Sequence, residues 1–276
     1  MHRSGTSAVT GVIDALGIQA CRPGDRMLPR QWNARGNYES ASLSRFDEGL
    51  LQHLGGEWQA PPKLSSGWAN HSGLTGLRAE AAQLFADAYP FEPWVWKDPR
   101  ACVLMPFWEL VLGTDTPRVL VLRNPLEIAA SLASRNRMTR EVVFALAERS
   151  LHSAIRDSAG RPVLVTAYNE VFDDFNGWLQ RVTDFIRANG IAMPGMPDVE
   201  RARSFVDSDL RHHREPGFEI GAETPDGLRR LWGWALERNG AHLALSIAGL
   251  PGESAEADAV LKAHRETRSR GHPTRA

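Results

Sequence analysis

Apolar positions along the chain follow two spacings, one typical of helices and one typical of buried strands. Helical spacing covers residues 6–16, 40–54, 74–88, 100–112, 125–135, 139–158, 173–189 and 225–248. Continuous apolar runs at 118–122 and 162–166 are typical of strands buried on both faces, and shorter strand candidates lie at 18–21 and 93–97. Strands separated by helices predict an α/β fold, with three α/β/α layers around a mostly parallel sheet.

The pattern also predicts how the chain is divided. Residues 1–252 carry the alternating elements and are expected to form a single α/β domain. Residues 253–276 are polar and lack aromatic side chains, so we expect a frayed or disordered tail there.

Polar residues follow three of the predicted strands. They are Lys97-Asp98-Pro99-Arg100, Arg123-Asn124-Pro125 and Tyr168-Asn169-Glu170. Ligands of open α/β sheets bind beyond the carboxyl ends of the strands. We therefore expect these three strand ends to converge on one site.

Composition narrows the class of protein. The chain has 276 residues, 42% of them hydrophobic and 24% charged, a composition that argues against a disordered chain. Its formal net charge of -1 argues against a general nucleic-acid or membrane-surface binder. Any anion site must therefore be local. Two cysteines and the lack of an apolar run of about 20 residues predict a soluble cytoplasmic protein without a membrane span.

The segment from His2 to Ser7 opens the first predicted helix and is a candidate phosphate loop. Backbone N–H groups at a helix N-terminus favour a phosphate, and Gly5 permits close approach of an anion. The structural alternative is simple capping of the helix by Ser4 or Thr6. The segment is not a Walker A loop, because the chain contains no Gly-Lys-Ser/Thr sequence.

With the segments that follow it, the loop resembles the sulfotransferase family that uses 3′-phosphoadenosine 5′-phosphosulfate (PAPS). Bacterial members have an Arg-Ser-Gly-Thr-Ser/Thr loop, which corresponds here to Arg3, Ser4, Gly5, Thr6 and Ser7. The resemblance implies a P-loop NTPase-like fold. It also implies that Arg123 and Ser131, eight residues apart, bind the 3′-phosphate, with Arg135 and Tyr168 as further nucleotide contacts. Asn169 departs from the family's usual Glu.

Two further segments bear on catalysis. Gly36-Asn37-Tyr38-Glu39 resembles a Gly-aromatic-aromatic-Glu element of the bacterial relatives, and Trp96-Lys97-Asp98-Pro99-Arg100 resembles their Trp-Lys-Asp-Pro-Arg element. Sulfuryl transfer needs a base for the acceptor proton and positive charge at the leaving oxygen. Our hypothesis is that Glu39 is the base and that Lys97, with Arg3, stabilises the leaving group; no metal is required.

Other interpretations of the same residues stay open. Taken singly, Glu39 could start a helix, Lys97 could end a strand in solvent and Arg123 could belong to a structural ion pair. His2, His53 and His71 are competing candidates for the base, and Leu210–Arg214 is better interpreted as a solvated basic turn than as a metal site. The alternative functions are a nucleotide-binding scaffold without turnover and, less favoured, a P-loop kinase. The acceptor could be a small molecule, a glycan, a lipid or a peptide.

The sequence also raises a question about the start of the fold. A phosphate loop normally follows a central strand, but this one begins at residue 2. An empty central position would expose the backbone groups of its neighbours. We therefore expect the natural protein to begin roughly 6–12 residues earlier, with the first strand that this sequence lacks.

Overall fold

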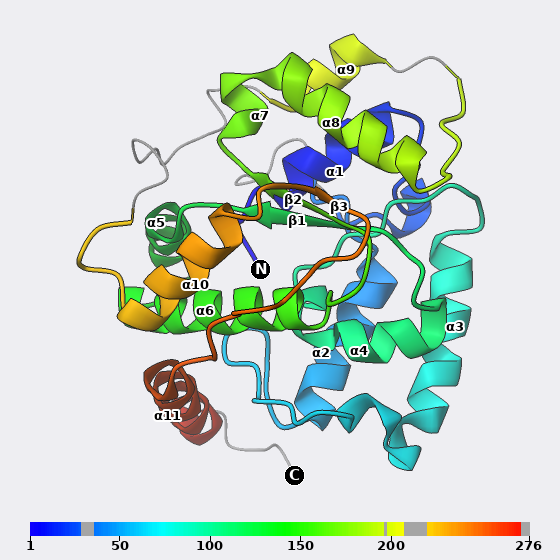
Figure 1. Ribbon diagram of the computed structural model, residues 1–276. Coiled ribbons are helices and arrows are strands. Elements are labelled where there is room, and N and C mark those ends of the chain that lie inside the picture. The colour runs from blue at the N-terminus through cyan, green and yellow to red at the C-terminus, as the bar shows by residue number, and fades with distance from the viewer. Residues whose placement is uncertain (29–35, 196–197, 207–219, 272–276) are drawn as a thin grey trace.

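The computed structural model of the chain describes residues 1–28, 36–195, 198–206 and 220–271 (Figure 1). The strands among these residues are β1 (Arg118–Leu122), β2 (Val163–Ala167) and β3 (Gly240–His242). The α-helices are α1 (Thr6–Ala15), α2 (Ala41–His53), α3 (Thr75–Ala88), α4 (Ala101–Leu112), α5 (Pro125–Asn136), α6 (Arg140–Arg156), α7 (Glu170–Asp173), α8 (Phe175–Ala188), α9 (Val199–Ser204), α10 (Asp226–Leu236) and α11 (Ala255–Gly271). Short 3₁₀ helices are η1 (Pro23–Asp25), η2 (Trp68–Asn70) and η3 (Ser72–Leu74).

Side-chain caps mark the starts of several helices that the apolar spacing predicts. The Ser40 hydroxyl accepts from the backbone N–H of Leu43 at the start of α2, and the Thr139 hydroxyl does the same for Val142 at the start of α6. Asn124 caps α5, whose first residue is Pro125. Local sequence therefore determines where these helices begin, close to the predicted boundaries.

The chain forms an α/β fold with a small mixed sheet in the order β1-β2-β3. β1 and β2 are parallel, with Leu120 opposite Val165, whereas β2 and β3 are antiparallel, with Leu164 opposite Ala241. The expectation of a mostly parallel sheet is therefore wrong for the described sheet. The predicted helix over 225–248 is also too long, because α10 ends at Leu236 and β3 follows it.

Two predicted strands are reduced to a single bridge. Gln19 and Trp94 pair in parallel: the N–H of Gln19 donates to the carbonyl of Pro93, and the N–H of Val95 donates to the carbonyl of Gln19. Pro93 has no N–H with which to extend the ladder. Among the described residues β1 pairs only with β2, and the expected strand before residue 2 stays a prediction.

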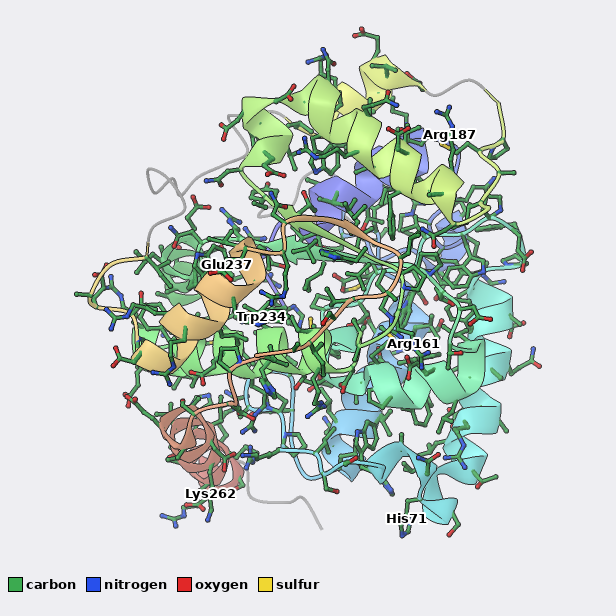
Figure 2. All side chains as sticks on the ribbon, in the orientation of Figure 1. His71, Arg161, Arg187, Trp234, Glu237 and Lys262 are labelled. Carbon is green, nitrogen blue, oxygen red and sulfur yellow. The ribbon has the colours of Figure 1, made fainter. Side chains whose placement is uncertain are left out.

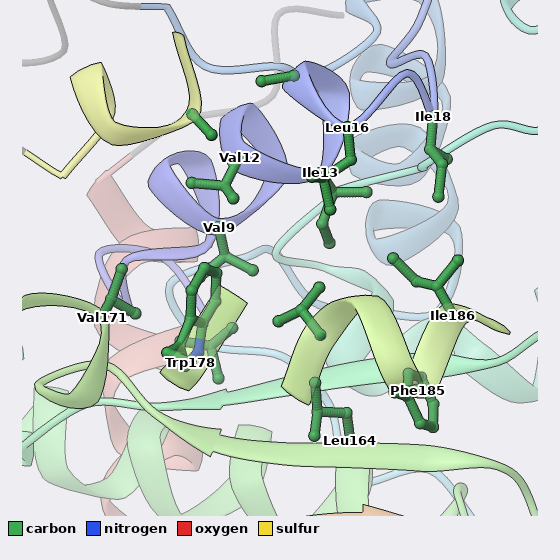
Figure 3. Packing of buried hydrophobic residues seen from close by; sticks show 14 of the residues in the cluster. Val9, Val12, Ile13, Leu16, Ile18, Leu164, Val171, Trp178, Phe185 and Ile186 are labelled. Carbon is green, nitrogen blue, oxygen red and sulfur yellow. The ribbon is translucent and has the colours of Figure 1, made fainter. Parts of the chain in front are cut away.

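Helices cover both faces of the sheet (Figure 1). Alternate strand residues point to opposite faces, so Val121 and Leu164 pack with α1 and α8, whereas Leu122 and Val165 pack with α10. Figure 3 shows the first of these clusters, where Val9, Val12 and Ile13 of α1 face Trp178, Phe185 and Ile186 of α8. α1 is therefore fixed against the sheet, and its N-terminus lies near the ends of β1 and β2.

The expected disordered tail is wrong for most of its length. Residues 255–271 form α11, which packs along α6, with Ala257 and Leu261 buried. The buried Arg149 of α6 holds this helix: its guanidinium lies 2.6 Å from Glu253 Oε1 and 2.5 Å from Asp258 Oδ1, and donates to the carbonyl of Pro61 at 2.8 Å. The packed structure thus extends beyond residue 252; residues 272–276 lie outside the described part.

Replacing Arg149 by Ala should lower the free energy of unfolding by about 3–5 kcal/mol, because it removes a buried side chain and leaves the Glu253 carboxylate, whose side chain is only 9% exposed, without its cation. Urea unfolding followed by circular dichroism measures the change. Arg187 is the control: it is exposed at the end of α8, far from α11 in Figure 2, and Arg187→Ala should cost less than about 1 kcal/mol. Equal losses in the two variants would refute the role of Arg149.

Candidate functional site

The anion loop, residues 3–7, enters α1 through a left-handed turn. Gly5 precedes the helix with φ 87°, and no side chain among the described residues caps the helix through a hydrogen bond. The Ser4 hydroxyl donates to the carbonyl of Met1 at 2.8 Å instead. Capping by Ser4 or Thr6, the structural alternative, is therefore wrong, and the positive end of the α1 dipole lies at this loop without a side-chain cap.

The three predicted strand ends converge on the anion loop. The Lys97 ammonium donates to Ser7 Oγ at 3.1 Å, and the Arg123 guanidinium donates to the carbonyl of Arg3 at 2.9 Å. The Tyr168 ring packs on Gly5 so closely that a Cβ at residue 5 would lie 2.2 Å from Cδ2 of the ring. Segments as far apart as residues 3 and 168 thus meet at one place, as the positions of the strand ends predict.

Three arginines bring positive charge to this place. Arg3 donates through Nε to Ser131 Oγ on α5 at 2.8 Å, which joins the loop to the second predicted signature. Burial, followed by the charges of Arg123 and Arg135, lowers the pKa of Arg3 to about 10. Arg3 is thus repelled by its two arginine neighbours, and Arg123 is itself paired with Glu127, whose Oε2 lies 2.7 Å from Arg123 Nε. An anion bound here would relieve the repulsion.

Tyr168 and Arg123 also contact each other directly. The Arg123 guanidinium carbon lies 4.9 Å from the centre of the Tyr168 ring, a cation–π distance. Both side chains are buried, so their positions are set by the ends of β1 and β2 and by the loop that they cover. The geometry therefore places the face of an aromatic ring against one cation of the arginine cluster.

Glu39 and Lys97, the predicted base and leaving-group stabiliser, form a buried ion pair. Lys97 Nζ binds Glu39 Oε1 and also donates to the carbonyl of Asn37 at 3.0 Å. With Ser7 Oγ, these two acceptors match the three donors of the ammonium. The two candidate catalytic groups are therefore paired with each other, directly beside the anion loop.

A second layer of buried polar groups lies behind this pair, and sequence reasoning gave it no role. The Ser44 hydroxyl lies 3.1 Å from Asp98 Oδ2 and 3.5 Å from Glu39 Oε2. Arg100 binds both Asp98, at 3.1 Å, and Glu48. The sequence contained a signal, because Ser44, Asp47 and Glu48 recur at helical spacing among the apolar residues of α2.

Asp47 is the most deeply placed carboxyl of this layer. Its Oδ1 accepts from the Trp108 indole at 2.9 Å, whereas its Oδ2 has no hydrogen-bond partner among the described residues. Burial, followed by the charge of Asp98, raises the pKa of Asp47 well above its usual value. The carboxylates of Asp98 and Glu48 outweigh burial at Arg100 and raise its pKa. The layer thus combines a buried carboxyl group whose pKa is raised with a firmly held cation.

The histidines that compete with Glu39 are less suited to act as the base. His2 packs against Trp58 in a tilted arrangement with ring centres 4.3 Å apart, and burial, followed by the charge of Arg100, lowers its pKa well below the usual value. His53 and His71 are exposed, and His71 Nδ1 accepts from the N–H of Gly73. A histidine that resists protonation is a weak base, whereas Glu39 lies at the anion loop.

Two of the three non-glycine residues with positive φ in the described part of the chain lie at this place, and the third, Arg137, ends α5. Arg3 has φ 65° and Tyr38, directly before Glu39, has φ 56°, in the left-handed region that costs a side-chain-bearing residue energy. Such residues occur preferentially at functional sites, where the surrounding structure holds them in place. Both predicted catalytic segments therefore carry a conformational constraint of their own.

Two other classes of site, a metal site and a membrane span, are not found in the described ranges. No group of three His, Cys, Asp or Glu side chains there is arranged to hold a metal ion, and no helix there is long and apolar enough to cross a membrane. The Leu210–Arg214 turn lies outside the described residues. Comparisons with protein-family models, with curated proteins and with solved structures found no match.

Gly5→Ala should lower the free energy of unfolding by about 1–2 kcal/mol for the left-handed backbone and by about 1–3 kcal/mol more for the contact with Tyr168. The matched control is Gly55→Ala, since Gly55 has φ 82° and open space around its Cβ position. Urea unfolding of both variants isolates the contact. An equal loss in the two would contradict the packing of Tyr168 on the loop.

Proposed function

We propose that the protein is a sulfotransferase that moves the sulfuryl group of PAPS to a hydroxyl or amine acceptor. The observation that carries the proposal is the convergence of three strand ends on the anion loop, with Lys97, Arg123 and Tyr168 each contacting it. The loop and this order of motifs also resemble the PAPS-dependent family. A P-loop NTPase-like arrangement is part of the same proposal.

The charges suit a nucleotide with two phosphate positions. Arg3 and the N-terminus of α1 would bind the 5′-phosphosulfate together with Lys97. Arg123, Ser131 and Arg135 would bind the 3′-phosphate, for which the forked donors of arginine are well shaped. The hydrogen bond between Arg3 and Ser131 brings these two groups of residues next to each other, as a single nucleotide would require.

The transfer step follows from these positions. The acceptor oxygen or nitrogen attacks sulfur in line, and the bond between sulfur and the bridging phosphate oxygen breaks. The electron pair of that bond leaves on the 5′-phosphate oxygen of 3′-phosphoadenosine 5′-phosphate (PAP), where Lys97 and Arg3 stabilise the charge. The proton of the acceptor passes to Glu39. Positioning and electrostatics supply most of the rate, as in phosphoryl transfer.

The ion pair between Lys97 and Glu39 must open for this step. PAPS supplies anionic oxygens at Ser7, within reach of the ammonium that now binds Glu39. Once Lys97 turns to the nucleotide, the Glu39 carboxylate is available to the acceptor. A scaffold protein that binds nucleotide but keeps the pair closed is the alternative, and it would bind PAP without transferring sulfate.

The first test is calorimetric titration with PAP, with AMP and ATP as controls. Binding that requires the 3′-phosphate is expected, and Arg123→Ala should weaken it by about 2–5 kcal/mol. Because Arg123 pairs with the fully buried Glu127, the double variant Arg123→Ala/Glu127→Gln removes both charges and tests whether the loss comes from misfolding. Normal affinity in the double variant would remove Arg123 from the site.

Glu39→Gln should lower turnover by about 10²–10⁴-fold while PAP affinity is largely kept, because the amide cannot accept the acceptor proton. Release of PAP from PAPS measures turnover, with the acceptor taken from a screen of carbohydrate, phenolic, lipid and peptide hydroxyls. The control is Glu57→Gln, which alters an ion pair with Arg268 at the start of another loop. Unchanged turnover in Glu39→Gln would refute the assignment.

A further inference from the structure

A hydroxyl with one proton lies between two buried carboxyl groups beside the anion loop. Ser44 Oγ is 3.1 Å from Asp98 Oδ2 and 3.5 Å from Glu39 Oε2. All three residues are more than nine-tenths buried, with exposed fractions of 7%, 7% and 8% for Ser44, Asp98 and Glu39. The Ser44 hydroxyl can donate to only one of the two carboxyl groups at a time. The other carboxyl group then faces the lone pairs of Ser44 Oγ.

Asp98 is held by Arg100, whereas Glu39 is held by Lys97, the residue that must move when an anion binds. Asp98 Oδ1 accepts from the backbone N–H of Arg100 at 2.8 Å and from its guanidinium at 3.1 Å. Ser44 therefore donates most favourably to Asp98, whose position is fixed. A Glu39 carboxyl that carries a proton could then donate to Ser44 Oγ, which completes a chain from Glu39 through Ser44 to Asp98.

The balance of charge around this chain changes when Lys97 moves away. The charged or titratable groups that face it are Lys97, Arg100, Asp47, Glu48 and Tyr89, with the buried His2, whose pKa burial keeps low, next to Arg100 and Lys97. Without Lys97, the cation Arg100 stands against the carboxyl groups of Glu39, Asp98, Asp47 and Glu48. A surplus of carboxyl groups favours a proton on one of them, and Glu39 is the one next to the anion loop.

We propose that Ser44 and Asp98 are positioning residues that hold Glu39 and strengthen it as a base once an anion at residues 3–7 has drawn Lys97 away. The inference rests on the proposed function. It adds that binding of the sulfuryl donor and the strength of Glu39 as a base are coupled. Before an anion binds, Lys97 is paired with Glu39. Afterwards the Ser44–Asp98 pair stabilises the protonated form of Glu39, which is the form produced by proton transfer from the acceptor.

The coupling can be measured without an acceptor, as uptake of protons on binding of PAP. Titrations at a pH about one unit above the usual glutamate pKa of about 4.3, in two buffers of different ionisation enthalpy, give the number of protons taken up. The phosphates of PAP contribute their own protons, so the relevant quantity is the uptake of the wild-type protein minus that of Glu39→Gln. We expect this difference to be a positive fraction of a proton.

Ser44→Ala and Asp98→Asn should each lose at least half of this difference in proton uptake. Ser44→Ala breaks the hydrogen-bond chain from Glu39 to Asp98, and Asp98→Asn removes the negative charge at its end. PAP affinity should stay within about threefold, because neither residue touches the arginine cluster. Ser42→Ala is the control on the same helix: Ser42 binds Asp25 and should leave the uptake unchanged. A purely structural role for Ser44 would alter stability but not the proton count.

Unchanged uptake in both Ser44→Ala and Asp98→Asn would overturn the inference, and so would a wild-type protein that takes up no more protons than Glu39→Gln. Inorganic pyrophosphate is the second probe, and it separates this failure from failure of the proposed function. Pyrophosphate binding with Glu39-dependent uptake, but no binding of PAP, would refute the nucleotide and support the coupling. If neither probe binds, both proposals fail.

Discussion

The arrangement of the candidate site depends on the buried ammonium of Lys97. A buried cation is costly unless it is paired and fully hydrogen-bonded. Lys97 meets that condition only by drawing three segments together, because its acceptors are Ser7 Oγ, the carbonyl of Asn37 and Glu39 Oε1. These contacts bring together the start of α1, the segment before α2 and the segment before α4. The sheet borders this side-chain cluster on one side only.

The other side of the site depends on the ends of β1 and β2. These parallel strands place Arg123 and Tyr168 in neighbouring positions, and the close contact between Tyr168 and Gly5 leaves no room for a side chain at residue 5. The anion loop is therefore held between a cation network and an aromatic ring. The backbone of the loop is left-handed at Arg3 and Gly5, a conformation that contacts on both sides of the loop hold in place.

Much of the fold and of the candidate site could be predicted because the signals are local. Caps such as Ser40 and Thr139 lie next to the apolar spacing that they introduce, and residues after parallel strands must share one edge of a sheet. The sequence does carry two signals for α11: Ser254 caps it, and Ala257 and Leu261, four residues apart, form a narrow apolar stripe. The helix was not predicted because the rest of its surface is polar. β3 was missed because Gly240, Ala241 and His242 have little strand propensity of their own, and pairing with β2 alone makes them a strand.

The layer behind Glu39 could not be predicted in the same way. Ser44 and Asp98 are 54 residues apart, and their contact depends on how α2 packs against the segment before α4. Buried polar groups of this kind lower stability unless each finds a partner, and Asp47 Oδ2 has none among the described residues. A chain optimised for stability alone would place apolar side chains there. The buried polar layer and the repulsion that Arg3 feels from Arg123 and Arg135 are therefore features that stability alone does not favour, and an anion bound at the loop would relieve that repulsion.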